Sequence, residues 1–137
     1  MTKFSTNALT ARYCAMRGWK ADTVQSWRGT QRHDLFFLFD TVALIDGRMV
    51  FVQNCSSGTL RAHREKFWQD VSFIRKIQKA GVEVELWEWK RKKTDGKLGW
   101  FLRTERFGDD NPGPWEGPFD LYPKKSKSED EHVRAED

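Results

Sequence analysis

Two long apolar segments joined by an Asp-Gly turn constrain the fold of this chain most. Residues 35–45 and residues 48–55 are both rich in hydrophobic side chains, and Asp46-Gly47 between them is a strong two-residue hairpin turn. Only Asp40 and Thr41 interrupt the first segment. Nearly continuous apolar strands are typical of central positions in a sheet that is covered on both faces. We therefore expect a β-hairpin at the centre of such a sheet.

Helical and strand patterns alternate on either side of this hairpin. A first helix is predicted from Ser5 or Asn7 to Arg17, where Gly18 ends it, and a short strand follows over residues 19–27. After the hairpin, the patterns predict a helix over residues 56–80, a strand over residues 82–89, a basic turn over residues 90–97 and a last strand over residues 98–107. The predicted order is α-β-β-β-α-β-β, which indicates an α/β domain with a central mixed sheet flanked by helices.

The composition changes at Gly108. Residues 108–123 form a Pro/Gly-rich arm that opposes regular structure, and residues 124–137 form a charged tail that we expect to be disordered. Residues 108–137 hold four Lys/Arg and nine Asp/Glu, so residues 1–107 carry a formal charge of +9, although the whole chain carries +4. A basic domain suits a polyanionic partner, of which nucleic acid is the commonest. The alternative is a basic protein that is merely soluble.

Several classes of protein are excluded by simple counts. Cys14 and Cys55 are the only cysteines, too few for a four-Cys zinc site or a secreted disulfide framework. The first residues lack the apolar core of a signal peptide, and no run reaches the roughly 18 apolar residues of a membrane span. We expect a cytoplasmic protein without a membrane partner.

Asp40 and Gln53 are the polar residues of the hairpin that can carry chemistry. A turn at Asp46-Gly47 pairs residues whose numbers sum to 93, so Asp40 faces Gln53. An ionised carboxylate inside an apolar strand is costly unless it is paired or coordinates a cation. A divalent cation held there by oxygen ligands would orient a water molecule and stabilise charge on a phosphate. The alternatives are a structural hydrogen bond and, if the strand bends, a second carboxylate from Asp34.

The order of elements and this hairpin resemble the PD-(D/E)XK nuclease superfamily, in particular its small archaeal and phage branch of Holliday-junction-resolvase-like proteins. The stretches that carry the resemblance, within residues 8–105, are Arg17-Gly18-Trp19, Arg32-His33-Asp34-Leu35-Phe36, Phe39-Asp40 and Val52-Gln53-Asn54-Cys55. The resemblance implies a restriction-endonuclease-like fold and a homodimer that acts on branched DNA in recombination. It also implies Mg²⁺ or Mn²⁺ as the cofactor of phosphodiester hydrolysis, and a phage protein that acts in a host cytoplasm.

The resemblance assigns catalytic positions to Asp40, Gln53, Cys55 and Gln25, of which only Asp40 keeps the residue type of the family. Gln53 takes the place of the family's Glu, which some members tolerate, and Gln25 lies where an additional Glu is expected. Cys55 falls where the catalytic Lys belongs, and a neutral thiol cannot supply a fixed positive charge to the reacting phosphate. The metal would be held by Asp40, Gln53 and the carbonyl oxygen of Asn54.

Two groups of basic residues are candidates for DNA contacts. The first, Arg61, Arg64 and Lys66, begins the second predicted helix, whose N-terminal amides also favour anions. The second is Lys90, Arg91, Lys92 and Lys93 with Lys97, close in sequence to Trp87, Trp89 and Trp100. Such residues neutralise phosphates, and tryptophan stacks on unpaired bases. Solvated lysines and core tryptophans are the alternative interpretation.

His33, His63 and Lys66 are further candidates for a general acid or a charge donor, although a loop histidine, a packed histidine and a solvated lysine are the commoner roles. Three hypotheses remain open at this point. The chain is a metal-dependent endonuclease, a catalytically silent descendant that binds DNA or a host protein without cleavage, or an unrelated α/β domain.

Overall fold

An open sheet between two helical layers forms the protein. The computed structural model describes residues 5–24, 26–28, 31–33, 35–36 and 38–121. The helices are α1 (Thr6–Arg17), α2 (Leu60–Gln69) and α3 (Val71–Lys79), and the strands are β1 (Lys20–Thr23), β2 (Ser26–Arg28), β3 (Gln31–His33), β4 (Thr41–Ile45), β5 (Arg48–Cys55), β6 (Glu83–Thr94), β7 (Lys97–Arg106) and β8 (Glu116–Phe119).

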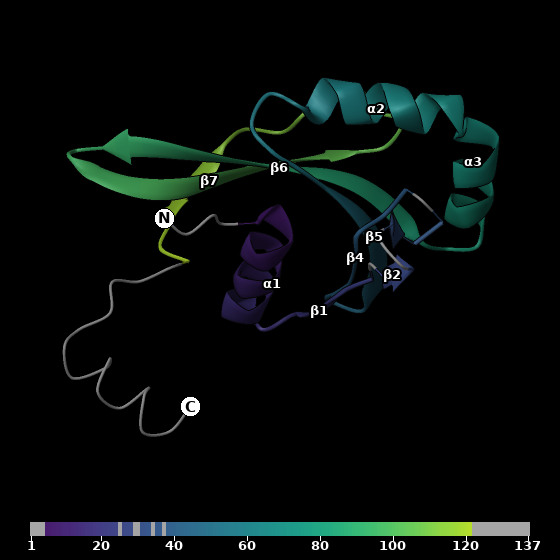
Figure 1. Ribbon diagram of the computed structural model, residues 1–137, viewed down its shortest axis with the longest axis horizontal. Helices are drawn as coiled ribbons and strands as arrows, with labels where there is room; N and C mark the ends of the chain where they lie inside the picture. The colour runs from purple at the N-terminus through teal and green to yellow at the C-terminus, as the bar shows by residue number, and fades with distance from the viewer. Residues whose placement is uncertain (1–4, 25, 29–30, 34, 37, 122–137) are drawn as a thin grey trace.

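The main sheet has six strands in the order β1-β4-β5-β6-β7-β8. Strands β5 and β6 are parallel, and every other neighbouring pair is antiparallel. Helix α1 lies on one face of the sheet, and α2 and α3 lie on the other (Figure 1). The predicted α/β class with a central mixed sheet flanked by helices is confirmed.

The β4–β5 hairpin turns at Asp46-Gly47, as predicted. Both residues have positive φ angles, 50° and 81°, the combination that a type I′ turn requires. The return strand spans the predicted residues 48–55, but the first strand is shorter than predicted. Strand β4 begins only at Thr41, and Leu35 and Phe39 before it pair with each other in an isolated antiparallel bridge. Leu38 and Phe39 are nevertheless 3% and 0% exposed, so the apolar run before Asp40 reflects burial of a turn rather than a strand.

The strand predicted over residues 19–27 is wrong as one element. Only β1 joins the main sheet, where it pairs with β4, whereas β2 pairs locally with β3 in a separate two-stranded sheet. The first helix agrees with prediction: Ser5 caps it by accepting a hydrogen bond from the N–H of Ala8 at 3.0 Å, and Gly18 ends it with φ 81°.

The helix predicted over residues 56–80 is two helices that meet at Asp70. The N–H of Asp70 donates to the carbonyl of Phe67, and the carbonyl of Asp70 accepts from the N–H groups of Phe73 and Ile74. One residue therefore ends α2 and begins α3. The bend in the chain, visible in Figure 1, lets Phe67 and Ile74 pack into the same core cluster although they lie on different helices.

The basic segment predicted as a turn over residues 90–97 is mostly strand. Strands β6 and β7 continue to a tight turn at Asp95-Gly96, where φ is 52° and 80°. We call the distal half of this hairpin, residues 90–101, the basic ribbon. It reaches past the helices at one end of the molecule (Figure 1). The sequence hides the end of β6 because residues 90–94 are all polar, so that no apolar alternation marks a strand there.

The arm predicted to lack regular structure contributes the edge strand β8, which pairs with β7 across a bulge. Phe119 anchors it, because its ring lies 5.1 Å from that of Tyr13 on α1, and Leu121 is 4% exposed. The tail over residues 124–137 lies outside the described residues.

The core has one cluster on each face of the sheet. The cluster under α1 contains Trp87 and Trp89, which are 2% and 1% exposed and are therefore core residues rather than stacking surfaces. The cluster under α2 and α3 contains Phe39, Cys55 and Phe67. Within the described part of the chain, no helix is long and apolar enough to cross a membrane.

Candidate functional site

Asp40 and Gln53 lie side by side, as the hairpin register predicts. Thr41 pairs with Val52, and the N–H of Asp40 donates to the carbonyl of Val52 at 3.1 Å, so Asp40 extends the β4 ladder by one residue. The Nε2 of Gln53 donates to Oδ2 of Asp40 at 3.1 Å. Alternation along β5 places both side chains on the face that α2 and α3 cover.

Both carboxylate oxygens of Asp40 accept hydrogen bonds from other groups of the protein. The backbone N–H of Asn54 donates to Oδ1 of Asp40 at 3.1 Å. The Nε2 of Gln53 is shared between Oδ2 of Asp40 and the carbonyl oxygen of Asn54, the latter at 2.9 Å. Asp40 is 4% and Gln53 6% exposed. The three groups predicted to hold a metal therefore satisfy one another inside the protein.

This donor set does not fit Mg²⁺ or Mn²⁺. Such cations need oxygen ligands and carboxylate charge, but Gln53 turns its NH₂ group toward Asp40. Rotation of the amide would place its carbonyl against two other acceptor oxygens. Among the described residues, no three His, Cys, Asp or Glu side chains are grouped so that they could hold a metal ion. Gln25, the remaining predicted catalytic residue, lies outside the described residues, as does Asp34.

The side chain of Asn54 ties α1 to the sheet from the opposite face. Its Nδ2 donates to Thr41 Oγ1 at 2.9 Å and to Asn7 Oδ1 at 2.8 Å. Its Oδ1 accepts from Thr10 Oγ1 at 2.5 Å, and that hydroxyl in turn accepts from Trp89 Nε1 at 2.9 Å. Asn54 is thus a structural residue on both sides of its strand.

Cys55 stands where the family's lysine would be, and it is fully buried. Burial raises the pKa of its thiol far above the usual value, and the charges of Glu88, Asp40 and Glu105 raise it further. The thiol therefore stays protonated and neutral at any physiological pH. Neither a nucleophilic thiolate nor a positive charge is available at this position.

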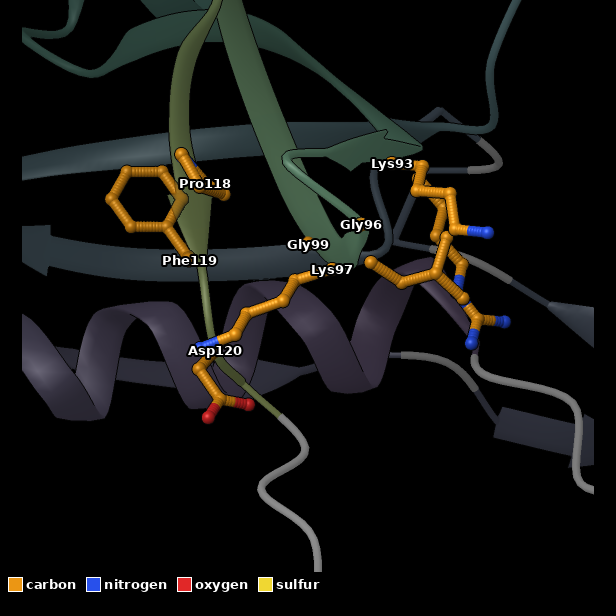
Figure 2. Close-up of a pocket in the computed structure, with 9 residues that line it drawn as sticks. Lys93, Gly96, Lys97, Gly99, Pro118, Phe119 and Asp120 are labelled. Atoms are coloured by element: carbon orange, nitrogen blue, oxygen red, sulfur yellow. The ribbon is translucent and has the colours of Figure 1, made fainter.

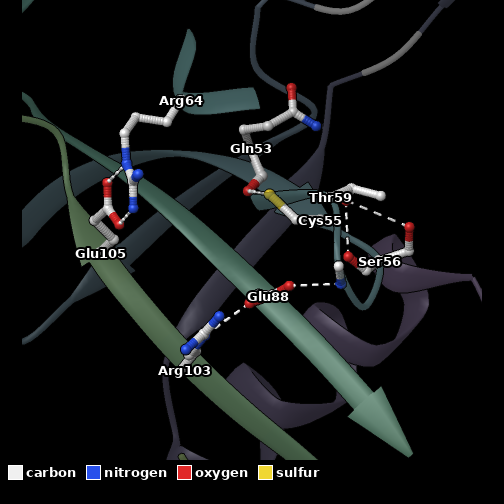
Figure 3. Close-up of polar contacts among 9 residues, drawn as sticks. Gln53, Cys55, Ser56, Thr59, Arg64, Glu88, Arg103 and Glu105 are labelled. Atoms are coloured by element: carbon white, nitrogen blue, oxygen red, sulfur yellow. Dashed lines mark hydrogen bonds and ion pairs between the residues drawn. The ribbon is translucent and has the colours of Figure 1, made fainter. Parts of the chain in front are cut away.

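Two buried glutamates near Cys55 are paired with arginines (Figure 3). Glu105 accepts two hydrogen bonds from Arg64, at 2.6 and 2.5 Å, and its side chain is 0% exposed. Glu88 accepts from Arg103 Nε at 2.7 Å and from the N–H of Gly58, also at 2.7 Å. Sequence reasoning missed these pairs, although Glu88 continues the apolar alternation of Val84 and Leu86 and so marked a buried charge.

The ion pairs determine which of the basic residues at the start of α2 remain accessible to DNA. Arg64, predicted to contact DNA, is held inside by Glu105 with its side chain 18% exposed. The backbone amide of Gly58, just before the helix, is already occupied by Glu88. Arg61 and Lys66 remain exposed, Arg61 with its Nε 3.5 Å from Glu65. His63 is half-buried, and for His33 only the backbone in β3 is described.

The basic ribbon concentrates exposed positive charge. It carries Lys90, Arg91, Lys92, Lys93 and Lys97 against one carboxylate, Asp95. All of them except the half-buried Lys90 are exposed. None of the four lysines forms an ion pair with any described residue, in contrast to Arg48, Arg64, Arg103 and Arg106 in the body of the protein.

Aromatic side chains support the ribbon where it joins the body. Trp115 lies between two cations, with Lys90 Nζ 4.3 Å and the Arg103 guanidinium carbon 4.6 Å from its ring centre. The guanidinium of Arg91 lies 5.8 Å from the ring of Trp100. These contacts hold long side chains along the strands and leave the lysines nearer the turn exposed.

A groove of about 710 Å³ runs between the ribbon and β8 (Figure 2). Arg91, Lys93 and Lys97 line it together with the apolar side chains of Leu98, Pro118 and Phe119, and Asp120 contributes a carboxylate. This groove, and not the Asp40–Gln53 pair, is where the described residues offer a ligand both charge and space. No protein-family model, curated protein or solved structure matches this chain.

Proposed function

We propose that this protein binds DNA through the basic ribbon and does not hydrolyse it. This is the silent form of the nuclease-like architecture that the sequence resembles. The observation that carries the proposal is the set of exposed ribbon lysines, Lys92, Lys93 and Lys97, which make no ion pair with any described residue.

Electrostatics supports DNA as the partner. Lysines without ion pairs on one projecting hairpin match a phosphate backbone, and the release of condensed counterions supplies affinity without sequence recognition. Arg64 and Arg103 in the body direct their charge to buried glutamates and so compete less for phosphate. The consecutive basic residues 90–93, together with Lys97, therefore place a cluster of positive charge at one end of the sheet.

The Asp40–Gln53 site supports binding without hydrolysis. Hydrolysis by a nuclease of this kind needs a metal that can reach both the carboxylate and the phosphate. Here the carboxylate oxygens accept protein hydrogen bonds at 4% exposure, and the position of the lysine holds a buried neutral thiol.

A gel-retention experiment with a labelled four-way junction and a linear duplex tests the function. We expect retention at low salt that is the same with Mg²⁺, Mn²⁺ or EDTA, and no nicked product. Simultaneous replacement of Lys92, Lys93 and Lys97 by Ala should weaken binding. It should also reduce the slope of log affinity against log salt by about 0.9 for each phosphate that the variant no longer neutralises.

The control removes two exposed lysines elsewhere. Lys76→Ala with Lys79→Ala on α3, which lies at the other end of the molecule from the ribbon (Figure 1), should leave retention unchanged. Absence of retention at low salt would remove the proposal. Metal-dependent nicking that Asp40→Ala abolishes would instead establish the active endonuclease, for which the adjacency of Asp40 and Gln53 is the favourable observation.

A further inference from the structure

An apolar row runs along one face of the β6–β7 hairpin and continues out to its tip. Leu102, Trp100 and Leu98 alternate along β7 and therefore share a face. Leu102 is 3% exposed in the core under α1, and Trp100 packs against that core. Leu98 is 56% exposed, the largest value among the exposed large hydrophobic residues of the described chain. A hydrophobic side chain thus stands in solvent near the end of a charged hairpin.

Positive charges surround this leucine. Its cross-strand partner is Lys93, its neighbour in sequence is Lys97, and Arg91 lines the same groove. One carboxylate, Asp120, also lines the groove, so the positive charges outnumber the negative one. The cations would hold a polyanion against the face on which Leu98 stands.

The backbone presents Leu98 on a well-defined structure rather than on a loose loop. Cross-strand pairs continue without interruption up to Thr94 and Lys97, which flank the Asp95-Gly96 turn. The positive φ angles of both turn residues match the twist of the strands. Leu98 is one residue from the end of this ladder, so it projects from a regular strand.

We propose that Leu98 is a wedge that inserts between neighbouring base pairs of duplex DNA while the ribbon lies along the minor groove. This inference rests on the proposed DNA binding and names the form of DNA that the ribbon selects. Apolar wedges flanked by basic residues unstack a base step and kink the duplex by about 20–90°. The ribbon therefore selects DNA that is easily kinked, such as flexible steps and junctions.

Bending of a short duplex tests the wedge. A duplex of about 20–30 bp is far shorter than the persistence length of DNA and stays nearly straight when free, so dyes on its two ends report a kink as increased energy transfer. We expect the wild-type protein to raise the transfer at saturation. Leu98→Ala should bind the same duplex without raising the transfer, because the phosphate contacts come from the lysines. Lys93→Ala should bind more weakly but reach the wild-type transfer at saturation.

Leu44→Ala is the matched control, since Leu44 on β4 is also an exposed leucine, 48% exposed, and lies outside the ribbon. It should behave as the wild type. If the wild-type protein bound the duplex without raising the energy transfer, the wedge would be overturned and DNA binding would stand. The same would follow if Leu98→Ala raised the energy transfer as much as the wild type does. Failure of the wild-type protein to bind would overturn both. Tighter binding of a duplex RNA of the same sequence would also overturn it, because the minor groove of A-form RNA is wide and shallow.

Discussion

Asp40 occupies the sequence position of a metal ligand but makes the contacts of a structural residue. Its carboxylate accepts from Gln53 Nε2 and from the N–H of Asn54, and the N–H of Val24 donates to its backbone carbonyl at 2.9 Å. These bonds join β4, β5 and the end of β1 at one point. A buried carboxylate with several donors needs no cation to offset its desolvation.

We expect Asp40→Ala to lower the free energy of unfolding by about 1–3 kcal/mol, because it leaves buried donors of Gln53 and Asn54 without an acceptor. Urea denaturation followed by circular dichroism measures the change. Asp22→Ala, an exposed aspartate on β1, is the control and should change stability little. An unchanged midpoint for Asp40→Ala would show that the carboxylate is not needed structurally and would revive a catalytic role.

The pair between Arg64 and Glu105 fastens α2 to β7 over a long sequence separation. Both hydrogen bonds of the guanidinium go to a carboxylate whose side chain is 0% exposed. Without the arginine, a buried negative charge would have no partner, which is more damaging than removal of the pair as a whole. The pair therefore determines where the helix sits on the sheet.

Arg64→Ala should destabilise the fold by roughly 3 kcal/mol. Arg64→Leu combined with Glu105→Leu should cost less than Arg64→Ala alone. Arg61→Ala, with a side chain 83% exposed on the same helix, should have almost no effect. Thermal unfolding reports all three. Equal losses of stability for Arg61→Ala and Arg64→Ala would contradict the structural role, and a selective loss of DNA retention in Arg64→Ala would return that residue to the binding surface.

The elements that sequence reasoning predicted well are those set by local chemistry. The Asp46-Gly47 turn, the bounds of β5, and the cap and end of α1 all follow from residues adjacent to them. The strand prediction for residues 35–39 is wrong because burial and strand formation produce the same apolar run. The break at Asp70 and the pairing of β8 depend on contacts with distant residues, which no local pattern contains.

The sequence predicts which residues of the candidate site lie side by side, but not the hydrogen bonds that they make. The turn register placed Asp40 beside Gln53, yet the direction of the Gln53 amide and the engagement of both carboxylate oxygens depend on the backbone of Asn54. The alternation around Glu88 indicates a buried charge, but the ion pairs of Glu88 and Glu105 could not be predicted because their arginines come from other elements. Part of the positive charge that the composition suggests for DNA binding, on Arg64 and Arg103, is paired with buried glutamates inside the protein.

Charged residues that form stabilising ion pairs and charged residues proposed to bind DNA lie in different parts of the molecule. Glu83, Glu88 and Glu105 are buried or half-buried beside arginines of the body, whereas the ribbon holds lysines at the opposite end of β6 and β7. Glu85 differs from these three because its side chain accepts its hydrogen bond from a tryptophan. It lies half-buried on the α1 face, beside cavities that Arg48 and Thr104 also line, and its Oε1 accepts from Trp87 Nε1 at 2.8 Å.

Glu85 should make the stability of the whole protein increase on mild acidification. Burial raises the pKa of its carboxyl and the charge of Glu83 adds to this, outweighing the hydrogen bond from Trp87 and the charges of Arg48 and Arg106. In the unfolded chain the pKa of a glutamate is about 4.3. At a pH above the raised pKa of the folded state, the charged carboxylate of Glu85 lowers the free energy of unfolding. Protonation of Glu85 removes this loss of stability. We expect Glu85→Gln, which still accepts from Trp87, to be more stable than the wild type at pH 7. The difference should shrink as the pH falls through the raised pKa and vanish below about pH 4.

Urea denaturation across this pH range measures the difference in stability between Glu85→Gln and the wild type, with the exposed Glu65→Gln as the control. A variant less stable than the wild type at pH 7 would show that the arginines favour the charged carboxylate more than burial opposes it.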